Sequence, residues 1–268
     1  MSPPNYIKKF LERWDDDREK LYFIGRGAAG TVLLDRRFPG LVFKISTSTN
    51  KCRDWKREIA IVDMMKKRIV ANDVIIDLPL VSLNMPHYHE VHDSKGVCVI
   101  QMPRVISLNK DKSVIVHPLF GVSNNRQQIE GRGHFLGRDE LIQEGYFNSE
   151  EAMLPYMSEL GSMMGILHYI IGVNGFDLEV LIGIREDSPK LVRLFIVDYD
   201  LFDFNEKFNI KDAIKNMEWS LSAVDYFPSK SDAPLLYKTF ETAYLSKASS
   251  VDSLDIANKV LTRFNNNN

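Results

Sequence analysis

The chain has 268 residues, of which 44% are hydrophobic and 26% charged, and this composition is typical of a globular protein with a sizeable core. A formal net charge of -2 gives no sign of nucleic-acid binding, and no apolar run approaches the length of a membrane span. The two cysteines are too few for a disulfide framework or a cysteine-rich zinc module, and the first residues lack the apolar core of a signal peptide. We therefore expect an intracellular protein of the cytoplasm or nucleus, without membrane contact.

Residues 6–20 predict a short amphipathic helix, because apolar residues recur there at helical spacing. A glycine-rich segment follows, and four residues fill its frame G-x-G-x-x-G-x-V: Gly25, Gly27, Gly30 and Val32. Dinucleotide-binding folds use similar glycines, but there the loop opens a helix. Here residues 31–34 are apolar or β-branched, a turn is expected at residues 39–40, and residues 41–45 form a second apolar run. This pattern predicts a hairpin of strands rather than a strand followed by a helix.

Lys44 lies in the second apolar run, so a glycine hairpin is followed by a lysine in the next strand. This is the nucleotide-binding arrangement of protein kinases. Glycines let backbone N–H groups approach phosphate oxygens, and the lysine supplies a positive charge to the α- and β-phosphates. The alternative is an ordinary hairpin with a glycine-rich turn and a solvated Lys44.

From Asp54, a plausible N-cap, apolar residues again recur at helical spacing, and the predicted helix carries Glu58 one turn from its start. In a kinase-like lobe, the helix after the lysine strand supplies a glutamate that pairs with the lysine and orients it. Glu58 is the candidate for that role, and the alternative is a solvated charge on a helix.

Residues 96–104 predict a buried strand that runs into a proline. By its order in the chain this strand matches the hinge between two lobes, where backbone groups near Met102 would meet an adenine ring. Residues 107–148 are polar, and we interpret them as loops and an insertion rather than a separate domain. We therefore expect an N-lobe at residues 1–105 and a C-lobe at residues 106–268.

A methionine-rich helix is predicted from residue 149, and its stripe of methionines is typical of a core face. A loop, a short strand, a turn and a second strand ending in Asp198 follow. Asp198-Tyr199-Asp200 then occupies the place of the Asp-Phe-Gly motif of kinases, where the first aspartate meets Mg²⁺. The alternative is an aspartate that caps a turn at the end of a strand.

The loop before these strands departs from the kinase pattern H-R-D-L-x-x-x-N. Asn174 stands where the catalytic aspartate belongs, and an asparagine cannot accept a proton as a base. Glu179 replaces the metal-binding asparagine and still offers oxygen ligands, while Asp177 in the same loop is a candidate for a displaced base. The parts for nucleotide and metal are present, and the part for phosphoryl transfer is altered.

Three segments together resemble an uncharacterised fungal domain family with a protein-kinase-like fold, whose members are sometimes labelled zinc-finger proteins. The segments are residues 167–183, residues 197–200 and residues 225–228, so the resemblance covers roughly the second half of the chain. The family usually has aspartate where this chain has Asn174, which argues against activity here. The resemblance implies origin and fold more than function, and two cysteines do not support the zinc-finger label.

The sequence thus predicts an α+β, two-lobed protein-kinase-like fold with a reduced C-lobe. The leading function is binding of ATP or a related nucleotide with Mg²⁺, by a degenerate kinase (a pseudokinase) that acts through a protein partner. One alternative is an active, atypical phosphotransferase on a small molecule or a protein, with Asp177 or Asp200 as base. Another is an interaction scaffold that binds no nucleotide. No Ala-Pro-Glu segment follows Asp200, which disfavours a conventional protein kinase.

Overall fold

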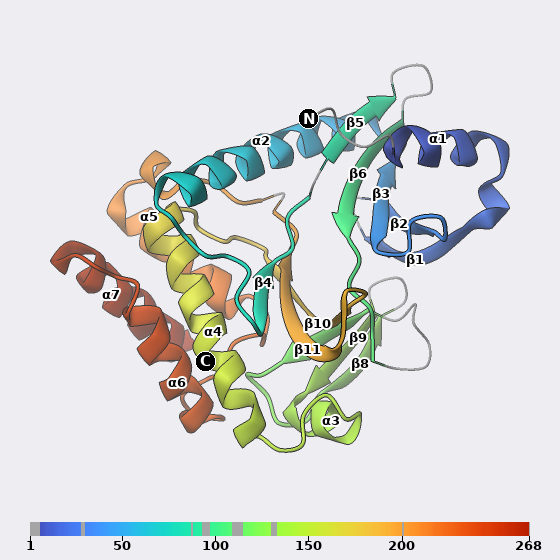
Figure 1. Ribbon diagram of the computed structural model, residues 1–268. Coiled ribbons are helices and arrows are strands. Elements are labelled where there is room, and N and C mark those ends of the chain that lie inside the picture. The colour runs from blue at the N-terminus through green and yellow to red at the C-terminus, as the bar shows by residue number, and fades with distance from the viewer. Residues whose placement is uncertain are drawn as a thin grey trace.

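A computed structural model describes residues 6–27, 30–86, 88–92, 97–108, 115–129, 133–199 and 201–267. In this part of the chain the fold is α+β, with small sheets and surrounding helices (Figure 1), and the predicted class is confirmed. Asp200 lies outside the described residues, so its expected role as a base has no structural counterpart here. No helix within the described ranges is long and apolar enough to cross a membrane.

The first sheet has the strand order β1-β2-β3-β6-β5, and every neighbouring pair in it is antiparallel. Its strands are β1 (Leu21–Gly27), β2 (Gly30–Asp35), β3 (Leu41–Ser46), β5 (Tyr88–His92) and β6 (Val97–Pro103). The predicted hairpin is therefore confirmed, with Gly27 paired to Gly30 across it. Helix α1 (Tyr6–Asp16) covers the sheet, and its Phe10 ring stacks on Phe43 of β3 at 4.2 Å between centroids.

Helix α2 (Thr49–Ala71) follows β3 and begins earlier than the sequence predicts. The side chain of Ser48 caps it by accepting a hydrogen bond from the backbone N–H of Lys51. Asp54 is consequently inside the helix, and its prediction as the N-cap is wrong. The sequence favoured Asp54 because the apolar spacing starts there, whereas Ser48 caps a first turn that is largely polar.

A disulfide joins Cys52 of α2 to Cys98 of β6. It closes a 46-residue separation and attaches the N-terminal end of α2 to the first sheet. The indole of Trp55 is fully buried in the same small cluster, together with Ile100. Because the two cysteines are paired, their number no longer argues for a reducing compartment.

The remaining elements surround two three-stranded sheets, ordered β10-β11-β4 and β7-β9-β8 (Figure 1). The strands are β4 (Val81–Leu83), β7 (Val116–Leu119), β8 (Arg126–Ile129), β9 (Gly133–Gly137), β10 (Glu179–Arg185) and β11 (Ser188–Val197). The helices are α3 (Arg138–Gln143), α4 (Leu154–Gly165), α5 (Ile210–Ser222), α6 (Pro234–Leu245) and α7 (Val251–Asn267). Strand β4 pairs with β11, so this pairing crosses the expected lobe division at residue 105.

The interpretation of residues 107–148 as loops is wrong, because β7, β8, β9 and α3 form there. The polar composition of this region concealed the strands from prediction by sequence pattern. Arg126 and Gln127 of β8 are exposed, and the strand RQQI lacks the alternation of apolar and polar residues that predicts a strand.

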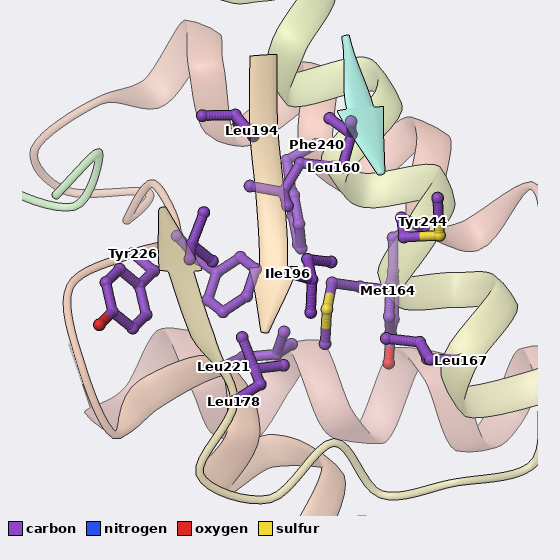
Figure 2. Packing of buried hydrophobic residues seen from close by; sticks show 14 of the residues in the cluster. Leu160, Met164, Leu167, Leu178, Leu194, Ile196, Leu221, Tyr226, Phe240 and Tyr244 are labelled. Carbon is purple, nitrogen blue, oxygen red and sulfur yellow. The ribbon is translucent and has the colours of Figure 1, made fainter. Parts of the chain in front are cut away.

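The largest core packs β10 and β11 against α4 and α6. Figure 2 shows Leu160 and Met164 of α4 with Ile196 of β11 and Tyr244 of α6. The methionine stripe of α4 is buried, so its prediction as core is confirmed. A Cβ on Gly161 would lie 2.3 Å from the backbone oxygen of Phe240, and therefore α4 and α6 need this glycine to approach so closely.

Candidate functional site

Lys44 and Asp198 meet in the structure, although 154 positions separate them in the chain. The Nζ atom of Lys44 lies 3.5 Å from Oδ1 of Asp198, and their side chains are 11% and 27% exposed. Lys44 lies in the middle of the sheet, between Val32 of β2 and Ile100 of β6. Asp198 directly follows β11 and has a left-handed backbone with φ of +62°. Non-glycine residues rarely adopt this conformation, and it occurs often at functional sites.

Helix α2 brings Glu58 to the same region. The Nζ atom of Lys44 is 5.7 Å from the ring centroid of Trp55, and Glu58 follows Trp55 by one helical turn. Glu58 is only 2% exposed, so its alternative interpretation as a solvated charge is wrong.

The phenol of Tyr199, the residue after Asp198, is fully buried in this region. Burial raises the pKa of Tyr199 well above its usual value, and the charges of Glu58 and then Asp198 raise the pKa further. Both carboxylates therefore lie close enough to act on one buried phenol, which donates a hydrogen bond to the backbone oxygen of Ile196 at 2.7 Å. Lys44, Glu58 and Asp198 thus converge on one small region.

The glycines of the hairpin lie toward the turn between β1 and β2, where Gly25 is opposite Val32 and Gly27 is opposite Gly30. Close packing also explains why residue 30 is a glycine. A Cβ at this position would lie 2.4 Å from the backbone oxygen of Ile45 and 3.0 Å from the Trp55 ring. The fold therefore requires a glycine at residue 30 whether or not phosphate binds there.

Asn174 is buried and fixes the loop between α4 and β10. Its Oδ1 accepts hydrogen bonds from the backbone N–H groups of Phe176 at 3.1 Å and Asp203 at 3.0 Å. Its own backbone N–H donates to the backbone oxygen of Asp203 at 2.9 Å. The side chain therefore ties the loop to the segment after Asp198, and this placement does not support contact with a transferred phosphate.

Asp177 and Glu179 frame the end of this loop. Asp177 is exposed and has a left-handed backbone with φ of +59°. Glu179 is the first residue of β10 and pairs with Val197 of β11. Since Asp198 follows Val197, Glu179 and Asp198 stand at adjacent ends of two paired strands.

The candidate metal ligands make up only part of a coordination shell. Among the described residues, no group of three or more histidine, cysteine, aspartate or glutamate side chains is arranged to hold a metal ion. Mg²⁺ prefers six oxygen ligands and commonly takes one or two carboxylates together with phosphate and water. Glu179 and Asp198 would supply two such carboxylates, and a metal ion held there would need further oxygens from a ligand.

Met102 lies at the end of β6, opposite Val42 of β3. Its side chain is half-buried against the cluster of Cys52, Trp55, Cys98 and Ile100. Met102 therefore lies in the same sheet as Lys44, and its expected place beside an adenine ring stays a prediction.

Sequence reasoning missed a set of contacts between α2 and the segment after Asp198. Arg57 pairs with Asp203 at 3.3 Å, and Arg68 pairs with Glu206 at 2.7 Å. The Arg68 guanidinium also donates to the backbone oxygen of Ile171 at 2.8 Å and lies 4.2 Å from the ring centroid of Phe204. These contacts fix α2 beside the loop that contains Asn174, and no local pattern could have revealed pairs so distant in sequence.

Comparison with models of known protein families finds no match for this chain. Comparison with curated proteins also finds none. The resemblance of residues 167–183, 197–200 and 225–228 to a fungal domain family therefore stays a prediction.

Proposed function

We propose that this chain is a two-lobed, protein-kinase-like protein with a reduced C-lobe that binds ATP or a related nucleotide together with Mg²⁺. The approach of Lys44 to Asp198 carries the proposal. In kinases, a strand lysine contacts the α- and β-phosphates while an aspartate after a later strand holds the metal that bridges β- and γ-phosphates. In this chain the two groups come from the corresponding strands, β3 and β11.

The surroundings of this pair support the same function. Gly25 and Gly27 lie in the hairpin that precedes Lys44, Glu58 lies on the helix that follows it, and Glu179 stands beside Asp198. We assign phosphate contact to Gly25, Gly27 and Gly30, orientation of Lys44 to Glu58, and metal binding to Asp198 with Glu179.

Phosphoryl transfer has weaker support than nucleotide binding. The side-chain oxygen of Asn174 accepts two backbone hydrogen bonds, and an amide cannot act as a base at the expected catalytic position. We therefore favour a pseudokinase that acts through a protein partner. An active phosphotransferase is the second candidate because exposed Asp177 lies in the same loop as Asn174.

Calorimetric titration with ATP, with and without Mg²⁺, tests the proposal. We expect binding that is tighter with the metal and that is weakened in Asp198→Asn. Lys190→Met serves as a control because this lysine is exposed on β11. Absence of binding at millimolar nucleotide would reject the proposal and favour a scaffold that binds no nucleotide. Release of ADP by the wild type, lost in Asp177→Asn, would favour the phosphotransferase.

A further inference from the structure

A groove of about 560 Å³ lies between α5 and α7. Figure 1 shows these two helices at the side of the molecule opposite the first sheet. The groove is lined by two isoleucines of α5, by three basic residues and by two neutral polar residues of α7: Ile210, Ile214, Lys211, Lys259, Arg263, Asn258 and Thr262. None of the candidate nucleotide-binding residues contributes to it.

The isoleucines form an apolar floor. Ile210 is the first residue of α5 and is 66% exposed, whereas Ile214, one turn further along the same face, is buried beneath the groove and joins the core. An exposed isoleucine that continues into a groove offers apolar area to a partner, because covering it removes this area from water.

The basic residues give the groove one sign of charge. Its lining contains no carboxylate. Lys259 pairs with Asp255, one turn back on α7, at 2.5 Å. Within the described part of the chain, neither Lys211 nor Arg263 takes part in an ion pair. Two cations at the groove are thus available to an acidic ligand.

We propose that this groove binds an acidic, amphipathic helix of a partner protein. Such a helix presents apolar side chains at a spacing of three to four residues, which suits a floor built from Ile210 and Ile214. Acidic side chains beside that stripe would meet Lys211, Lys259 and Arg263. A nucleic acid fits less well, because its phosphates would gain nothing from the apolar floor.

This inference rests on the partner-dependent part of the proposed function and not on nucleotide binding. It identifies the surface by which a pseudokinase with this fold would recruit its partner. The groove lies on helices outside the Lys44–Asp198 region, so the two binding events can be measured separately.

Fluorescence anisotropy with a designed peptide tests the proposal. The probe is a labelled helix of about 15 residues, with leucines at helical spacing and glutamates elsewhere. We expect it to bind the wild type and to bind more weakly as salt rises from about 0.05 M to 0.3 M. The matched control peptide carries lysine in place of every glutamate and should not bind.

Variants of the groove residues test whether the peptide binds in the groove. Lys211→Glu with Arg263→Glu should weaken peptide binding by about tenfold or more, because attraction becomes repulsion. Ile210→Asn should weaken it through loss of apolar contact without a change of charge, and an exposed position tolerates the change. Lys8→Glu with Lys9→Glu reverses two exposed charges on α1 and should leave binding unchanged.

Three outcomes would overturn the inference. They are absence of peptide binding, equal binding in the groove variants, and binding of a short single-stranded DNA that is as tight as the peptide and is lost in the same variants. Calorimetry with ATP on the charge-reversed groove variant separates this inference from the proposed function, because nucleotide affinity should not change there. Absence of nucleotide binding in the wild type, with peptide binding intact, would instead count against the nucleotide proposal alone.

Discussion

The ammonium group of Lys44 and the carboxylate of Asp198 lie 3.5 Å apart at a region where β3, β11 and α2 converge. Both side chains retain some solvent contact, so the pair itself adds little to the free energy of unfolding. The importance of the pair lies in where it places the two charges. A nucleotide would take Lys44 to a phosphate and Asp198 to a metal ion, and each charge would keep an opposite charge beside it.

Replacement of Lys44 tests whether this side chain contacts a phosphate of the nucleotide. We expect Lys44→Met to weaken nucleotide binding about 10- to 100-fold, because a charge-assisted hydrogen bond contributes about 1.5–3 kcal/mol. The fold should persist, since methionine fills a similar volume within β3. Calorimetric titration measures the affinity and circular dichroism checks the fold. Unchanged affinity in a folded variant would remove Lys44 from the phosphate site.

Asn174 should act on stability rather than on nucleotide affinity. Asn174→Leu leaves the N–H groups of Phe176 and Asp203 without an acceptor, and we expect a loss of about 2–4 kcal/mol in the free energy of unfolding. Asn174→Asp keeps an accepting oxygen and should lose less. Urea unfolding gives both values. An Asn174→Asp variant that folds but binds nucleotide far more weakly would show that this side chain belongs to the binding site.

Gly30 is a test of packing. Gly30→Ala places a Cβ against the backbone oxygen of Ile45, and we expect a loss of about 1–3 kcal/mol. Gly40→Ala is the matched control, because the added Cβ meets only the flexible end of Glu186 and should change stability by less than about 0.5 kcal/mol. Thermal or urea unfolding distinguishes the two, and equal effects would contradict the crowding at residue 30.

His168 makes stability depend on pH. Its ring is buried between Tyr244, at 2.7 Å from Nδ1, and Ser220, at 3.2 Å from Nε2. Burial lowers the pKa of His168 from 6.5 to about 3. Below pH 6.5 the unfolded chain therefore binds a proton that the folded protein does not, so stability falls as the pH falls.

The expected loss assigned to this histidine is about 2 kcal/mol between pH 6.5 and pH 5. Urea unfolding across this range measures it. His168→Gln cannot titrate there, so its stability should fall less steeply than that of the wild type. Parallel pH profiles for the two proteins would mean that His168 does not carry the effect.

Local features of the fold were predictable from the sequence. The strands from Gly25 to Lys44 are predicted by glycines, β-branched residues and a turn, all within one short stretch of sequence. The placement of Asp198 at the end of a strand depends equally on its immediate neighbours. The approach of Lys44 to Asp198 was expected only from the order of elements in kinases.

Features that depend on distant partners were not predictable. The acceptor role of Asn174 requires Asp203, which comes 29 positions later, and the disulfide requires β6 to return beside the start of α2. The sheet formed by β7, β8 and β9 also escaped prediction, because its strands are short and β8 consists mainly of polar residues.

Helix α2 belongs to two hydrophobic cores at once. Trp55 packs beneath the first sheet, while Val62 and Met65 pack in the large core with β11 and α4. The disulfide at Cys52 and the ion pair at Arg68 hold its two ends to different parts of the molecule. Because the large core takes residues from α2 and β4, the protein should melt in a single cooperative transition. A fragment that begins near residue 106 lacks both elements and should not fold alone.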